Sequence, residues 1–292
     1  MDMPDKAPLI CVGMPVYNGE LFLAEAIESI LGQSVGDLEL IISDNASTDG
    51  TQDICRSLAA RDSRIRYMRQ VANLGASENY NTVFRNSRSQ YFKWASSNDV
   101  CHREFLAKCL DALRDRPNVV LCYPRTRMFV DDPASGSEFD DGFDASDDDP
   151  CRRFVQVVRR LGYNNVMNGV MRSDVLRKTN LIKPYFGSDI VLMAELALCG
   201  KFLEIPEFLF FRRVSEKSAT HFKTKLEIVR HYYPADGSTM RFPNWKLHLG
   251  YLSVAVKAPL DLGDRTRVLL AAVRHMWWAQ SRLVSDLRLR GA

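Results

Sequence analysis

Features that define several large classes of protein are missing from these 292 residues. The seven cysteines form no C-x-x-C pair, and their scattered positions and odd number favour reduced thiols over disulfides or a zinc site. A formal charge of +3 is close to neutral for this length, which argues against a nucleic-acid partner. We find no run of about 18 apolar residues and therefore predict no membrane span. The N-terminus also has no basic segment leading into an apolar core, so we expect no signal peptide and a cytoplasmic protein.

What the N-terminal part does contain is three apolar runs that each end in polar residues. The runs and their ends are Leu9–Met14 with Pro15–Asn18, Leu38–Ile42 with Ser43–Gly50, and Gln90–Ala95 with Ser96–Asp99. In a parallel α/β sheet, ligands bind outside the carboxyl ends of the strands. The pattern therefore predicts a nucleotide site formed by these three ends.

Helical and extended patterns alternate along most of the chain. Helical spacing of apolar residues predicts helices over residues 19–33, 51–60, 77–86, 103–114, 151–161 and 190–198. Short apolar runs predict further strands over residues 65–68, 119–123, 201–206 and 209–213. This alternation is typical of a doubly wound α/β sheet flanked by helices.

An acidic segment interrupts the alternation. Residues 131–150 hold nine Asp or Glu residues and no Lys or Arg, with Gly, Ser and Pro between them. This composition is typical of a mobile surface loop. It is either a solvated insertion or a loop that controls access to an acceptor, and its Asp spacing does not fit a calcium loop.

The end of the chain is expected to be helical from about residue 221, with a long last helix over residues 266–289. One apolar stripe runs along it, and Trp277 and Trp278 lie among arginines. Such a helix either closes the domain, pairs with a second copy in a homodimer, or lies on an anionic membrane. A peripheral position at the inner face of a membrane therefore stays open beside packing.

The motifs at the strand ends resemble those of the inverting glycosyltransferases of family 2, which have the GT-A fold. Pro15-Val16-Tyr17-Asn18 is similar to the family's P-x-Y-N, and Ser43 to Asp49 is similar to V-D-D-G-S-x-D. Asn73-Leu74-Gly75 matches N-x-G, and Ser96-Ser97-Asn98-Asp99 stands in the place of D-x-D-D. Phe186-Gly187-Ser188-Asp189, with Glu195, resembles the segment that carries the family's base. Each motif alone is weak, but five in this order make a strong signal.

The resemblance implies the division of the chain. Residues 1–220 would be a GT-A domain with a mixed, mostly parallel sheet. About 8–125 would form the half that binds the nucleotide sugar, and about 126–220 the half that binds the acceptor. Residues 221–292 would be a helical C-terminal extension.

The resemblance also implies a donor site. Its residues would be Pro15, Tyr17, Asn18, Asp44, Asn45, Asn73, Asn79, Asn98, Asp99, Arg212 and Arg213. Asp44 would accept a hydrogen bond from the base, although an Asp in such a sequence also favours a turn. One of the two arginines would face the diphosphate, although a solvated pair of arginines at a strand end is an equal alternative.

Asp99 is the residue that the resemblance assigns to a divalent metal. Mn²⁺ or Mg²⁺ takes carboxylate oxygens and offsets charge on the leaving diphosphate. Ser96 and Asn98 replace the two earlier carboxylates of the family motif, and Ser215 stands where a histidine is common. We therefore expect the metal to bind weakly or to be dispensable.

Asp189 would be the general base of an inverting transfer. A carboxylate there would take the proton of the acceptor hydroxyl on the face opposite the leaving group. Ser188, Asn168 and Gly169 would line the acceptor pocket, although a helix cap and a tight turn are competing interpretations.

The sequence thus predicts transfer of a sugar, most simply from a UDP-sugar, to a hydroxyl group. The acceptor would be a glycan, as in polysaccharide biosynthesis, a lipid-linked saccharide or a natural product. The different-class alternative is a catalytically impaired nucleotide-sugar-binding or scaffold protein on the same fold. A nucleotidyltransferase fits less well, because residues 15–20 are not a glycine-rich phosphate loop.

Overall fold

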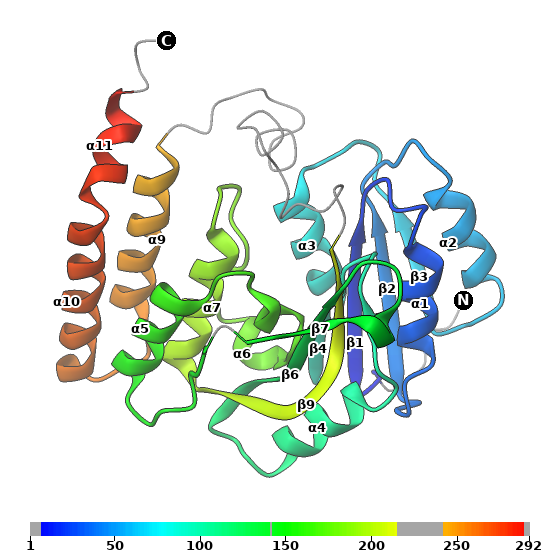
Figure 1. Cartoon of the computed structure of the whole chain (residues 1–292), viewed down its shortest axis with the longest axis horizontal. Helices are drawn as coiled ribbons and strands as arrows, with labels where there is room; N and C mark the ends of the chain where they lie inside the picture. The colour runs from blue at the N-terminus through cyan, green and yellow to red at the C-terminus, as the bar shows by residue number, and fades with distance from the viewer. Residues whose placement is uncertain (1–6, 141, 215–241, 289–292) are drawn as a thin grey trace.

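The computed structural model describes residues 7–140, 142–214 and 242–288, and its central feature is one mixed sheet (Figure 1). The strand order is β3-β2-β1-β4-β8-β6-β9-β5, and β7 pairs with β6 outside this path. The sheet is flanked by helices, as the alternation of patterns predicted.

The first half of the sheet is parallel. Its elements are β1 (Ile10–Val16), α1 (Leu23–Leu31), β2 (Leu38–Asp44), α2 (Thr51–Ala59), β3 (Ile65–Arg69), α3 (Ala76–Arg85) and β4 (Tyr91–Trp94). β1 lies between β2 and β4 and is buried along its whole length. Strands that are covered on both faces have continuous apolar sequences. The strands of this half could therefore be predicted from the sequence.

The second half mixes strand directions. Its elements are β5 (Val100–Cys101), α4 (Phe105–Arg114), β6 (Val119–Phe129), β7 (Ser137–Phe139), α5 (Pro150–Arg160), β8 (Val170–Arg172), α6 (Ser173–Leu176), α7 (Ser188–Cys199) and β9 (Lys201–Arg213). β8 runs antiparallel to both β4 and β6, and β9 runs parallel to β6. The two strands expected over 201–206 and 209–213 are one continuous strand. Its pairing with β6 shifts register at Pro124 and Arg125, and the strand continues beyond Pro206 because of this irregularity.

The surface loop predicted over residues 131–150 is mostly exposed and irregular, but it is packed more closely on the sheet than its composition indicated. β7 pairs with β6 in this segment, and the side chains of Phe143 and Ala145 are buried in the core. The carbonyl of Ala145 accepts a hydrogen bond from the amide of Phe202 in β9. Two apolar side chains therefore anchor a segment whose composition is dominated by charge.

The C-terminal part is a layer of three helices, α9 (Pro243–Lys257), α10 (Leu262–Trp278) and α11 (Gln280–Arg288). Figure 1 shows this layer at the end of the molecule away from α1 and α2, with α9 next to α7. The single helix expected over 266–289 is two helices, which meet at Ala279. The predicted domain boundary at about residue 220 lies outside the described residues.

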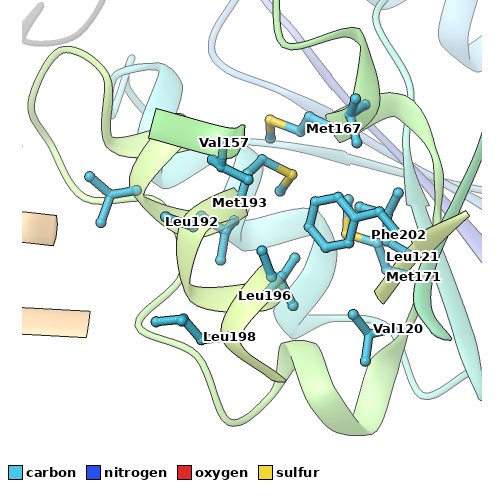
Figure 2. Close-up of a cluster of buried hydrophobic side chains, with 14 of the residues drawn as sticks. Val120, Leu121, Val157, Met167, Met171, Leu192, Met193, Leu196, Leu198 and Phe202 are labelled. Carbon is cyan, nitrogen blue, oxygen red and sulfur yellow. The ribbon is translucent and has the colours of Figure 1, made fainter. Parts of the chain in front are cut away.

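Two apolar clusters pack against the sheet, and the one that contains α7 joins the sheet to the C-terminal layer. Figure 2 shows its centre, where Leu192, Met193 and Leu196 of α7 face Leu121 of β6 and Phe202 of β9. The same cluster extends to Val83 of α3 on one side and to Tyr251 of α9 and Val268 of α10 on the other. The C-terminal helices therefore share the core of the sheet.

Candidate active site

The polar ends of β1, β2 and β4 meet at one edge of the sheet, as the sequence predicted. Val16 at the end of β1 is in register with Asp44 at the end of β2. On the other side of β1, Gly13 is in register with Trp94, the last residue of β4. The segments that follow these strands, 17–22, 45–50 and 95–99, therefore share this edge.

Asp44 organises the loop that follows β2. Its carboxylate is fully buried and accepts hydrogen bonds from the amide of Ser47 at 2.8 Å and the hydroxyl of Tyr67 at 2.8 Å. Its third partner is the guanidinium of Arg69 on β3, at 2.5 Å. These contacts give Asp44 a structural role, and its expected contact with a nucleobase stays a prediction.

The asparagines of the donor motifs are joined to one another. Asn45 donates to the side chain of Asn73 at 2.7 Å, and its own oxygen accepts from the amide of Leu74 at 2.8 Å. Asn18, in a left-handed backbone conformation, accepts from the amide of Thr48. These contacts connect the loops after β1, β2 and β3.

Pro15, Tyr17 and Asn79 have different surroundings. Pro15 is buried within β1, while the ring of Tyr17 is half exposed at the edge of the sheet, where a base could stack. Asn79 of α3 is buried, accepts from the hydroxyl of Ser43 and donates to the carbonyl of Ser43 at 3.0 Å. Asn79 thus joins α3 to β2.

Asp99 lies in a buried position after β4. Its carboxylate accepts from the backbone amide of Arg213, at the end of β9, at 2.9 Å. Burial raises the pKa of Asp99, and the positive charge of Arg212 is the largest influence in the opposite direction. The neighbouring carbonyl of Asn98 accepts from the side chain of Arg213 at 3.1 Å.

The two arginines at the end of β9 face different surroundings. Arg213 is buried, pairs with Glu25 of α1, and its guanidinium lies over the rings of Phe22 and Phe129. Arg212 donates to the carbonyl of Tyr163 at 2.7 Å and to the side chain of Asn165. The backbone amide of Arg213 is thus bonded to Asp99, while the contact of either arginine with a diphosphate stays a prediction.

Tyr80 of α3 is a site residue that the sequence analysis missed. Burial and the negative charges of Asp99 and Asp189 raise its pKa to about 12, with Arg212 acting in the opposite direction. Tyr80 therefore lies in the electrostatic field of both candidate carboxylates. Its position between Asn79 and Asn81 in α3 could have indicated it from the sequence.

Asp189 lies in the first turn of α7, as predicted. Gly187 precedes the helix with a φ of 81°, a conformation that L side chains rarely adopt, and so ends the loop at this point. The hydroxyl of Ser188 donates to the carbonyl of Lys183 at 2.6 Å. Glu195, further along α7, is held by the amide groups of Asn180.

Asn164 is the second residue that the sequence analysis missed. Its side-chain amide donates to the Asp189 carboxylate at 2.8 Å. Its backbone is left-handed, with a φ of 50°, which costs free energy in any residue except glycine. The Asn-Asn pair at 164–165 was the available signal, since Asn tolerates this conformation better than most residues.

The dipeptide Asn164–Asn165 connects the two halves of the site. Asn164 presents its nitrogen to the Asp189 carboxylate, and Asn165 presents its oxygen to the Arg212 guanidinium. Because each charged partner dictates one orientation of the amide, both side chains are fixed. The oxygen of Asn164 and the nitrogen of Asn165 are buried and have no hydrogen-bond partner among the residues that the structure describes.

The other acceptor-side predictions have mixed surroundings. Gly169 packs so closely on β6 that a Cβ would lie 2.6 Å from the carbonyl of Cys122, so its small size serves packing. Asn168 is partly exposed at the end of a short 3-10 helix. The acceptor roles of Asn168, Gly169 and Ser188 stay predictions.

A divalent metal fits this site only in a restricted form. Within residues 7–140, 142–214 and 242–288, no group of three His, Cys, Asp or Glu side chains converges to hold an ion. Asp99 would be the one carboxylate ligand, with diphosphate oxygens and water completing the set, an arrangement that Mg²⁺ accepts. Ser215, in the place of the family's histidine, lies outside the described residues.

Comparison with known sequences identifies the N-terminal part. Residues 11–142 match the family model described as glycosyl transferase family 2. Chondroitin synthase from Escherichia coli is 31% identical over 122 residues, covering 42% of this chain and 18% of the synthase. The putative teichuronic acid biosynthesis glycosyltransferase TuaG from Bacillus subtilis is 32% identical over 114 residues, covering 39% of this chain and 45% of TuaG.

The match to one further relative is longer and weaker. An uncharacterized glycosyltransferase from Haemophilus influenzae is 24% identical over 261 residues, covering 82% of this chain and 79% of the relative. The chain spans less than half the length of the synthase and of TuaG.

Comparison with solved structures identifies the fold. The S. aureus TarS 1–349 complex with UDP-GlcNAc superimposes with a TM-score of 0.68 at 13% identity, covering 95% of this chain and 79% of TarS 1–349. The mannosyltransferase PcManGT from Pyrobaculum calidifontis, in complex with GDP-Man and Mn²⁺, gives a TM-score of 0.54 at 16% identity, covering 95% and 76%. Residues 11–142 therefore resemble glycosyl transferase family 2, and the likeness to these structures shows that the chain has the GT-A fold.

Proposed function

We propose that this protein is an inverting glycosyltransferase that moves one sugar from a nucleoside-diphosphate sugar, a UDP-sugar in the first instance, to a hydroxyl group. The observation that carries the proposal is a chain of hydrogen bonds between two carboxylates. Asp189 is bonded to Asn164, the adjacent Asn165 to Arg212, and the adjacent Arg213 to Asp99. One carboxylate serves the leaving diphosphate and the other the incoming hydroxyl.

Asp189 is the proposed base. As the acceptor oxygen bonds to the anomeric carbon, the bond from that carbon to the diphosphate oxygen breaks, and the hydroxyl proton passes to Asp189. Attack from the face opposite the diphosphate inverts the anomeric centre. Asn164 holds the carboxylate at 2.8 Å and limits its rotation during this step.

On the donor side, Arg212 would bind the diphosphate through its forked N–H groups. Asp99 would hold Mg²⁺ or Mn²⁺, which when bound offsets negative charge on the leaving diphosphate. Arg213 fixes Asp99 from behind through its backbone amide. The donor class is supported by the nucleotides in the TarS and PcManGT complexes, while the acceptor stays open among saccharides, lipid-linked saccharides and natural products.

The test begins with calorimetric titration of UDP into the full chain, with and without Mn²⁺. We expect binding that strengthens with the metal and weakens in Asp99→Ala. Asp189→Asn should bind UDP like the wild type but lose UDP-sugar turnover by about 10²- to 10⁴-fold, the range of general base catalysis. Asp174→Asn, which changes an exposed carboxylate at the start of α6, is the matched control.

A catalytically impaired nucleotide-sugar-binding or scaffold protein is the second candidate. The observation that favours it is the single carboxylate at the metal position, where Ser96 and Asn98 replace acidic residues. Wild-type protein that binds UDP-sugars but releases no UDP with any acceptor would select this candidate. Turnover that Asp189→Asn abolishes would reject it.

A further inference from the structure

Helix α10 packs with its small side chains inward and its large apolar side chains outward. Its buried residues are Val268, Ala271 and Ala272. Its exposed apolar residues are Leu262, Leu270, Val273, Trp277 and Trp278. Core burial alone would produce the opposite arrangement, because large apolar side chains gain most from leaving water.

The exposed residues of α10 share one face. Leu270, Val273 and Trp277 follow one another at intervals of three and four residues, the spacing of neighbours on a helix surface. Trp277 is 68% exposed and Trp278 is 55% exposed, which is unusual for the largest side chain. Contiguous exposed apolar surface of this kind marks an interaction site.

Two arginines lie directly beside this surface. The guanidinium of Arg159, from the last turn of α5, lies 4.3 Å from the ring centre of Trp278, and that of Arg274 lies 5.2 Å from it. Both arginines are exposed, and neither forms an ion pair with any residue that the structure describes. The acidic residue of α10, Asp264, is paired with Arg267 instead.

The pKa of the partly buried His275 is lowered in part by the same positive charge. Burial lowers the pKa of His275 to about 4, and the charges of His248, Arg159 and Arg282 lower it further. Arg159 and Arg274 lie at the same end of α10 and form no ion pair with a described residue. An anionic and apolar partner would complement this surface.

From this combination we infer that the face formed by Leu262, Leu270, Val273, Trp277 and Trp278 with Arg159 and Arg274, here called the tryptophan–arginine face, binds an anionic lipid surface. Indole rings settle at the boundary between headgroups and acyl chains, and arginines beside them attract acidic headgroups. The inference is independent of the transfer reaction proposed above.

Charge decides against a second copy of the chain as the occupant. A two-fold symmetric dimer through this face would set the patch against itself and bring the same unpaired arginines together. Like charges in such an interface cost free energy, whereas acidic lipid headgroups complement them. The face also leaves the site free, because α9 lies between α10 and α7, which carries Asp189 (Figure 1).

The test is flotation of the full chain with vesicles of phosphatidylcholine alone or with about one-third phosphatidylglycerol. We expect binding to the anionic vesicles, little to the neutral ones, and loss of binding in high salt. Arg159→Gln with Arg274→Gln should weaken binding by about thirtyfold, since each arginine near an anionic surface adds about a factor of five. Trp277→Ser with Trp278→Ser should weaken it by roughly tenfold or more.

Matched controls are Arg114→Gln and Val71→Ser, which change exposed residues far from the C-terminal helices in sequence and should bind like the wild type. UDP titration and thermal melting verify that each variant is folded. Equal binding to both vesicle types, or binding to neither, would overturn the inference. So would a dimer in sedimentation equilibrium that the tryptophan variant converts to a monomer.

Discussion

At the scale of single residues, Asn164 is the position where backbone strain and site geometry coincide. Its left-handed backbone places the side-chain amide against Asp189. The side-chain oxygen of the next residue, Asn165, accepts a hydrogen bond from Arg212. Residues held in such conformations cluster at functional sites, where surrounding contacts maintain the strain. In the proposed mechanism Asn164 is a positioning residue, because its contact with the reaction runs through Asp189.

Asn164→Gly is the informative change, because glycine adopts the same backbone conformation without cost and only the amide is removed. We expect UDP-sugar turnover to fall by about 10- to 100-fold, since the base is no longer held in place. UDP affinity should stay the same, and stability should fall by only about 1 kcal/mol for the lost hydrogen bond. Turnover, UDP titration and thermal melting measure the three quantities.

The matched control is Asn180→Ala, which removes a similar amide–carboxylate contact at Glu195, also on α7. It should lower stability by a similar amount without the loss of turnover. If Asn164→Gly turns over at the wild-type rate, Asn164 does not position the base.

At the scale of elements, the strands and helices of the first half were predictable because β1, β2 and β4 are continuous apolar runs that end in recognisable motifs. The last helix was harder, since the sequence alone does not tell that α10 packs through Ala271 and Ala272 rather than through its tryptophans. The packing of the acidic segment was hard to predict for a related reason. Many of its residues are exposed carboxylates, but two apolar residues, Phe143 and Ala145, hold it against the core.

Phe143→Ala tests whether the acidic segment is anchored. The ring lies 6.2 Å from that of Tyr123 and 6.3 Å from that of Phe202, measured between centres. Removing a buried phenylalanine leaves a cavity, and we expect the free energy of unfolding in urea to fall by about 3–5 kcal/mol.

Asp131→Ala, an exposed position in the same segment, should change the unfolding free energy by less than about 0.5 kcal/mol. Equal, small effects of both substitutions would mean that the segment contributes no core packing, as its composition first indicated.

At the scale of the whole molecule, the partly buried His275 of the C-terminal layer predicts a pH dependence of stability. His275 is stacked on His248, with ring centres 5.2 Å apart, and its folded-state pKa is about 4 against an ordinary value of 6.5. Between these values the unfolded chain binds a proton that the folded chain does not. Stability from this group is therefore complete above pH 6.5 and is lost as the pH falls toward 4.

Comparison with His275→Gln separates the contribution of this histidine from that of carboxylates that titrate in the same pH range. The wild type should lose about 1–3 kcal/mol more than the variant between pH 7 and pH 4 in urea unfolding, the lower figure reflecting the partial exposure of the ring. His102→Gln, at an exposed histidine, should retain the wild-type slope. Parallel pH profiles of wild type and His275→Gln would contradict the assignment.

The continuity of β9 also has a consequence for thermal unfolding. One thirteen-residue strand carries Arg212 and Arg213 within its pairing with β6, and its Phe202 lies in the apolar cluster shared with α7 and the C-terminal helices. The two arginines of the proposed donor site are therefore part of a paired strand. Loss of nucleotide affinity and global unfolding should occur at the same temperature, and amide hydrogens of the paired part of β9 should exchange with solvent only when the whole protein opens.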